Sequence, residues 1–149
     1  MIVSAGIPEL EDAVALVDEF VEAGLRFVAF KPGTVEQIRS VVRIANEVPQ
    51  HPIIVQIEGG RAGGHHSWED LDDLLLATYG ELRARPTSSS ASAVRRHPGA
   101  GERIPDRCLA TAYGYPQMPL DGILIGTAAM ATKEATTTPE VKQLLVDTA

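Results

Sequence analysis

One stretch of sequence decides the fold: residues 52–66 read PIIVQIEGGRAGGHH. Its first half is an apolar run, which is typical of a strand buried on both faces. Its second half places four glycines within six positions and ends in two histidines. Glycines directly after a buried strand let the backbone approach a ligand closely, and binding groups in parallel α/β folds gather at the carboxyl ends of strands. The stretch therefore predicts a strand that leads into a binding loop.

Strand-loop-helix patterns flank this stretch. Short apolar strands are expected at residues 2–6 and 27–30, each followed by an amphipathic helix, over residues 9–21 and 34–45. Ser67 is the expected N-cap of a third helix. Three such units in a row predict a parallel α/β sheet, either doubly wound or part of a (β/α)8 TIM barrel. Because a complete barrel needs about 250 residues, this chain can hold only part of one.

Two local signals fix the ends of these helices. Thr34 and Gln37 have the spacing of a capping box, in which the threonine side chain accepts a hydrogen bond at the helix N-terminus. Gly24 follows the first helix and is expected to end it, because glycine readily adopts the left-handed conformation found there.

A fourth unit is expected near the end of the chain. Residues 121–127, DGILIGT, read as a buried strand that ends at Gly126 and Thr127, and a closing helix is expected over residues 140–146. A strand that turns directly into a helix N-terminus can bind phosphate, although the two residues also fit a tight turn and an ordinary helix cap. We therefore expect a single partial barrel domain, with three units in residues 1–86, an irregular segment at 87–108 and the last unit at 109–149.

Composition narrows the class of protein. The chain is 44% hydrophobic and 22% charged, as expected for a folded soluble domain, and its net charge of −7 argues against nucleic acid as a partner. No apolar run approaches the roughly 20 residues that span a bilayer, so we expect no membrane partner. Cys108 is the only thiol, which excludes an internal disulfide and fits a cytoplasmic setting.

The glycine-histidine loop is the expected active site. His65 directly follows Gly63 and Gly64, and a flexible connector alone would not require two adjacent histidines so close to a strand end. A metal site is not expected, because His65 and His66 have no obvious third ligand to complete zinc geometry. We therefore predict that His65 acts in binding or catalysis rather than in metal coordination.

The same loop carries a resemblance to a known family. Residues 56–70, QIEGGRAGGHHSWED, resemble the flavin-site segment of the enoyl reductase domain in type I fatty acid synthases of fungi and actinobacteria. The core at residues 62–65, AGGH, is shared with nitronate monooxygenases. Four further segments resemble the synthase domain in the same order: residues 4–8, 30–34, 112–116 and 122–133.

The resemblance implies an FMN-dependent enoyl reductase fragment. About half of a (β/α)8 barrel would reduce trans-2-enoyl thioesters on an acyl carrier domain with NAD(P)H, within a larger fatty acid synthase chain or complex. His65 would donate a hydrogen bond or proton to the developing enolate. The implied cofactor-binding residues are Lys31, Gln56, Gly63 and Gly64 near the flavin, and Gly126 and Thr127 at its phosphate. The alternatives are a nitronate monooxygenase and an inactive truncated gene product.

Residues 87–108 do not fit the resemblance. Residues 87–93, TSSSASA, read as a linker, and the rest is basic and rich in glycine and proline, where the family has an apolar strand and a triple-glycine loop. If the serines use TCN codons, the frame one base earlier reads NTC, which encodes Phe, Leu, Ile or Val. We therefore predict that compensating frameshifts, or sequencing errors, replaced a core strand and a phosphate-binding loop, which would leave the chain a poor flavoprotein without activity.

Overall fold

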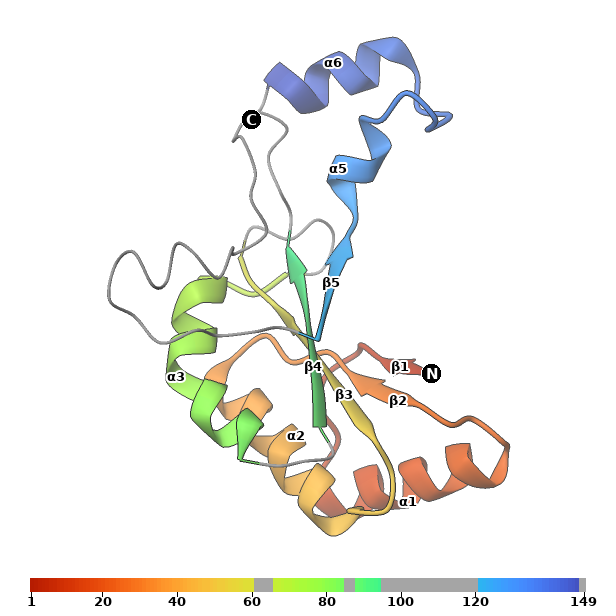
Figure 1. Ribbon diagram of the computed structural model, residues 1–149, viewed down its shortest axis with the longest axis vertical. Helices are drawn as coiled ribbons and strands as arrows, with labels where there is room; N and C mark the ends of the chain where they lie inside the picture. The colour runs from red at the N-terminus through yellow and green to blue at the C-terminus, as the bar shows by residue number, and fades with distance from the viewer. Residues whose placement is uncertain (61–65, 85–87, 95–120, 148–149) are drawn as a thin grey trace.

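The computed structural model describes residues 1–60, 66–84, 88–94 and 121–147. Within these ranges, five parallel strands form one sheet in the order β1-β2-β3-β4-β5 (Figure 1). The elements follow one another as β1 (Ile2–Val3), α1 (Leu10–Glu22), β2 (Val28–Phe30), α2 (Val35–Glu47), β3 (Ile53–Glu58), α3 (Leu71–Arg83), β4 (Ser88–Val94), β5 (Gly122–Ile125), α5 (Thr127–Met130) and α6 (Pro139–Asp147).

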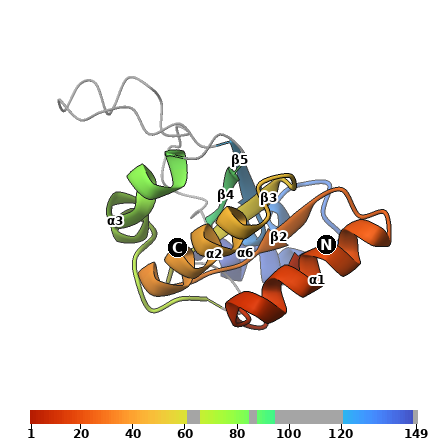
Figure 2. The same ribbon diagram turned by 90° about the horizontal axis from the view of Figure 1, so that it is seen from below.

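Helices α1, α2 and α3 lie on one side of the sheet (Figure 2), whereas α5 and α6 lie beyond the end of β5 (Figure 1). The core lies between these three helices and the strands. Ile53, Val55 and Ile57 of β3 are at most 1% exposed and pack in a single cluster with the inner residues of the helices. Because side chains alternate along a strand, Gln56 and Glu58 face the opposite side of the sheet.

The helix ends follow from local chemistry, as the sequence predicts. Thr34 Oγ1 accepts a hydrogen bond from the Gln37 N–H at 3.2 Å, and Gly24 has a φ of +84° just after α1. The Gln37 side chain does not complete a capping box on Thr34. Its oxygen accepts from the Gly33 N–H at 2.8 Å instead, one residue before the expected donor. The start of α2 is therefore fixed by two side-chain contacts, of which the sequence predicted one.

Several predicted boundaries are wrong. The first strand was expected over residues 2–6 and ends at Val3, and the last was expected over residues 121–127 and spans Gly122–Ile125. Two other elements differ at their start. The N-cap of α3 is Asp70, which accepts from the Asp72 N–H at 3.0 Å, and not Ser67. Strand β2 begins at Val28, and Phe27 is 56% exposed although it was expected in the buried strand. In both cases the apolar pattern places the element correctly but misses its first residue.

Strand β4 corrects the interpretation of residues 87–93 as a linker without a strand. The backbone of β4 pairs with β3 on one side, where Val55 opposes Ser90, and with β5 on the other, where Leu124 opposes Ala93. A parallel ladder is made by backbone N–H and C=O groups, so small residues can pair wherever neighbours supply partners on both sides. The prediction that this segment forms no strand is therefore wrong, while the frameshift stays a prediction. Residues 95–108 lie outside the described residues.

The described sheet belongs to the expected α/β class with parallel strands. Its sequential order, with α1 to α3 on one side, fits both a barrel segment and an open sheet, so the partial (β/α)8 barrel stays a prediction. Among the described residues, no helix has the length and apolar character needed to cross a membrane.

Candidate functional site

The carboxyl ends of β2 and β3 bring together two of the predicted site residues. Lys31 directly follows β2, and Gln56 lies in β3. Phe30 opposes Val55 in the parallel ladder, so the next residues along the two strands, Lys31 and Gln56, lie side by side. Gln56 is buried, at 7% exposed. This geometry agrees with the expectation that Lys31 and Gln56 lie together at the carboxyl ends of the strands. Their role in binding stays a prediction.

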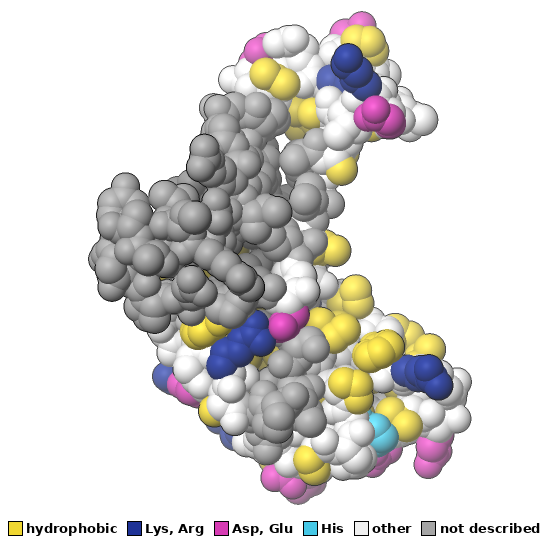
Figure 3. All heavy atoms as spheres, viewed as in Figure 1, with side chains coloured by type: hydrophobic (Ala, Val, Ile, Leu, Met, Phe, Trp, Pro, Cys, Tyr) yellow, Lys and Arg dark blue, Asp and Glu magenta, His cyan; other side chains and the backbone are white. Residues whose placement is uncertain are grey.

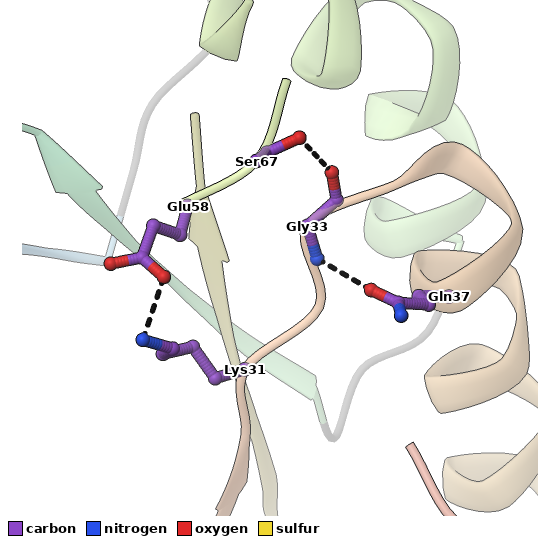
Figure 4. Close-up of polar contacts among 5 residues, drawn as sticks. All are labelled: Lys31, Gly33, Gln37, Glu58 and Ser67. Atoms are coloured by element: carbon purple, nitrogen blue, oxygen red, sulfur yellow. Dashed lines mark hydrogen bonds and ion pairs between the residues drawn. The ribbon is translucent and has the colours of Figure 1, made fainter. Parts of the chain in front are cut away.

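Lys31 forms an ion pair that the sequence analysis missed. Its Nζ lies 2.7 Å from a carboxylate oxygen of Glu58, and the two side chains are 17% and 9% exposed (Figure 4). A carboxylate this buried is stable as a charged group only with a cation or hydrogen-bond donors beside it. The alternation of β3 could have revealed Glu58, because it lies two residues after Gln56 and therefore on the same face.

Ser67 ties together the loops that follow β2 and β3. Its hydroxyl donates to the Gly33 carbonyl (Figure 4) and accepts from the Glu69 N–H at 2.8 Å. The Gly60 N–H donates to the Glu69 carbonyl, also at 2.8 Å. Residues on both sides of the predicted glycine-histidine loop are thus fixed at the edge of the sheet.

Gly59 allows β3 and α3 to meet closely. A Cβ at this position would lie 2.6 Å from Leu71 Cβ and 2.7 Å from the Leu71 nitrogen. Any larger residue would therefore push the first residue of α3 away from the end of β3. This close approach is the packing reason for one of the four glycines in the loop.

The remaining predicted site residues are not brought to this edge by the described structure. His65, Gly63 and Gly64 lie outside the described residues. Gly126 follows β5 and Thr127 begins α5, a helix of four residues, and the Gly126 carbonyl accepts from the Ala129 N–H at 2.9 Å. Strand β4 separates β5 from β3 in the sheet. The described residues do not test whether these five residues belong to a site.

Comparisons with known proteins point to fatty acid synthesis. A family model described as "Fatty acid synthase subunit beta/Fas1-like, helical" matches residues 52–149. The chain is 40% identical over 154 residues to the fatty acid synthase beta subunit pkiC of Emericella nidulans and 43% identical over 148 residues to pigK of Monascus ruber. It is 37% identical over 151 residues to the fatty acid synthase subunit beta of Saccharomyces cerevisiae.

The alignments cover nearly all of this chain but only a small fraction of each relative. The three alignments cover 98%, 97% and 96% of this chain, but only 8%, 7% and 7% of the respective relatives. The chain therefore spans less than a tenth of the length of these curated relatives.

These matches correct the identity and cofactors predicted from the sequence. They name the beta subunit of fatty acid synthase and a region described as helical. They name neither an enoyl reductase domain nor a nitronate monooxygenase, so both predicted activities are withdrawn, together with FMN and NAD(P)H as cofactors. The resemblance to type I fatty acid synthases agrees with these matches in its coarser part, the synthase itself. The activity was inferred from the glycine-rich segment after a strand, and such a turn serves many kinds of ligand site.

Proposed function

This chain belongs to the Fas1-like family of fatty acid synthase beta subunits, and from this membership we propose that it works in fatty acid synthesis as a segment of such a subunit. The observation that carries the proposal is the coverage of the alignment, which includes 96% of this chain but only 7% of the Saccharomyces cerevisiae subunit. A segment of that size contributes structure and side chains to a larger enzyme. Its partner is the remainder of the synthase chain or complex, and its setting is the cytoplasm.

The two outermost strands of the sheet, β1 and β5, have features that support a role within a larger chain. In the described ranges, β1 and β5 each pair with one neighbour only. Ile2 of β1 and Leu124 of β5 are 53% and 50% exposed, and the strand registers place both on the face away from α1 to α3. Apolar side chains also gather on the surface over β1 and β2 (Figure 3). Open edges beside apolar surface favour association with further strands or another covering element.

The ion pair between Lys31 and Glu58, at the ends of β2 and β3, provides polar groups that could bind a substrate. Lys31 is a cation whose position is fixed by Glu58, and Gln56 adds a buried amide beside it. An ammonium positioned in this way can donate a hydrogen bond to the carbonyl oxygen of a thioester. We therefore assign the carboxyl ends of β2 and β3 as the binding site of an acyl thioester substrate, which an acyl carrier domain presents.

A chimeric subunit tests the proposal. This chain replaces the matching segment of the Saccharomyces cerevisiae beta subunit, in cells that lack their own copy, and growth without added fatty acids is measured. The proposal expects growth. An assembled but inactive chimera would contradict it and would favour the inactive truncated gene product.

A paired substitution then tests the site. Lys31→Met, made together with Glu58→Gln so that no buried carboxylate loses its cation, should lower the turnover of the purified chimera by about 10² or more, because an oriented donor to a reacting carbonyl is lost, while assembly of the subunit is unchanged. The matched control is Arg26→Met, which removes an exposed cation outside the site. Equal turnover in the two variants would remove Lys31 from the site.

A further inference from the structure

Trp68 exposes an unusual amount of apolar surface for its position. It is the only tryptophan in the chain and is 86% exposed, although its neighbour Ser67 is only 7% exposed. An aromatic side chain buries roughly 150–250 Å² when a partner covers it. The indole therefore offers a large contact area close to the candidate site.

The backbone that carries this indole is fixed on both sides. Ser67 is bound to the Gly33 carbonyl, and its hydroxyl accepts from the Glu69 N–H at 2.8 Å. The Glu69 carbonyl accepts from the Gly60 N–H at 2.8 Å. A side chain displayed on a fixed backbone loses little conformational freedom on binding, which is a property of the aromatic anchors that dominate protein interfaces.

The negative charges that follow Trp68 in the sequence favour a positively charged partner. Glu69, Asp70, Asp72 and Asp73 come within five residues of it, and no Lys or Arg occurs between residues 66 and 82. Asp70, Asp72 and Asp73 are exposed. A second copy of this surface would bring like charges together, which is unfavourable, whereas a basic surface would be attracted.

A further exposed apolar residue lies on α3, on the face that carries two of these carboxylates. Leu76 is 69% exposed and lies four residues after Asp72 and three after Asp73, so the three side chains share one face of the helix. We call Trp68, Glu69, Asp70, Asp72, Asp73 and Leu76 the Trp68 surface. Phe27, another exposed aromatic residue, follows Arg26 and lacks this acidic surrounding.

We propose that the Trp68 surface is a docking surface for a basic part of the fatty acid synthase. The indole enters an apolar pocket of the partner, and Lys or Arg side chains around that pocket pair with the carboxylates of α3. This inference rests on the proposed function, because the synthase supplies the partner.

The single tryptophan makes the docking directly measurable. The 149-residue chain is labelled with 5-fluorotryptophan, so that Trp68 gives one 19F NMR signal. The probe is the Saccharomyces cerevisiae beta subunit from which the matching segment has been removed. We expect the signal to shift and broaden as the subunit is added, and the binding to weaken as sodium chloride rises. An unchanged signal would overturn the proposal, and binding that is insensitive to salt would overturn the basic character of the partner.

Substitutions identify which residues carry the binding, measured by sedimentation velocity. Trp68→Ala should raise the Kd about tenfold or more, and Trp68→Phe should restore part of the affinity. The double variant Asp72→Asn/Asp73→Asn should also bind more weakly, and its matched control, Asp18→Asn/Glu19→Gln on α1, should not. Trp68→Ala binding as tightly as the parent would overturn the proposal. Because no catalytic activity is measured here, an inactive chimera affects the proposed function alone.

Discussion

Replacing Gly59 by alanine should destabilise the chain where β3 meets α3. The new Cβ would lie 2.6 Å from Leu71 Cβ, 2.7 Å from the Leu71 nitrogen and 2.9 Å from Leu71 Cα. Two of these three atoms belong to the backbone, so the clash is relieved only if the start of α3 moves relative to β3. Overpacking typically costs about 1–3 kcal/mol, and we expect the upper part of this range because backbone must move.

The control for this substitution is the same chemical change inside α3, at a position where a Cβ has room. A Cβ at Gly80 of α3 would meet no atom within 4 Å. Gly80→Ala should therefore raise the free energy of unfolding by about 0.8–1 kcal/mol, because alanine favours the helix. Urea unfolding followed by circular dichroism measures both variants. The reasoning is refuted if Gly59→Ala is as stable as the parent, or if both variants shift in the same direction.

Two further predictions concern individual hydrogen bonds. Ser67→Ala removes a buried hydroxyl that bonds to the Gly33 carbonyl and the Glu69 N–H, so the free energy of unfolding should fall by about 1–3 kcal/mol; an unchanged exchange rate of the Glu69 amide proton would contradict this role. The pKa of Glu140 lies below its ordinary 4.5, because its carboxylate accepts hydrogen bonds from its own backbone N–H and from Thr138. Because the pKa of Glu140 is lowered in the folded state, its ionised carboxylate stabilises the fold above pH 4.5, and this stabilisation is lost as the pH falls through the lowered pKa. Thr138→Ala should raise the pKa of Glu140, which an NMR titration measures. Equal titration midpoints of Glu140 in the parent and the variant would argue against the contact with Thr138.

The helices could be predicted from the sequence because their signals are local. Thr34 caps α2 through the nitrogen three residues later, and Gly24 ends α1 with its own conformation. Strand β4 could not be predicted in the same way. Its serine and alanine residues carry no apolar pattern, and its pairing depends on the backbones of β3 and β5, which lie outside its own local sequence.

The candidate site was predictable only in part, for a similar reason. Lys31 and Gln56 stand at the ends of apolar runs, so the topology of a parallel sheet places them together. Glu58 carries no apolar signal beside the glycines, but β3 continues through it and aligns it with Lys31. Ser67 has the sequence context of a helix cap, yet its hydroxyl bonds to Gly33, a contact between residues 34 positions apart.

The strand order has a consequence for how the protein is made. Each described strand after β1 pairs with the described strand that precedes it in the chain. During translation, each described strand after β1 therefore meets one partner that has already been made. Short separations between partners also reduce the entropy lost when they pair, which favours rapid folding. The sheet can thus grow in one direction, from β1 towards β5, at the pace of synthesis.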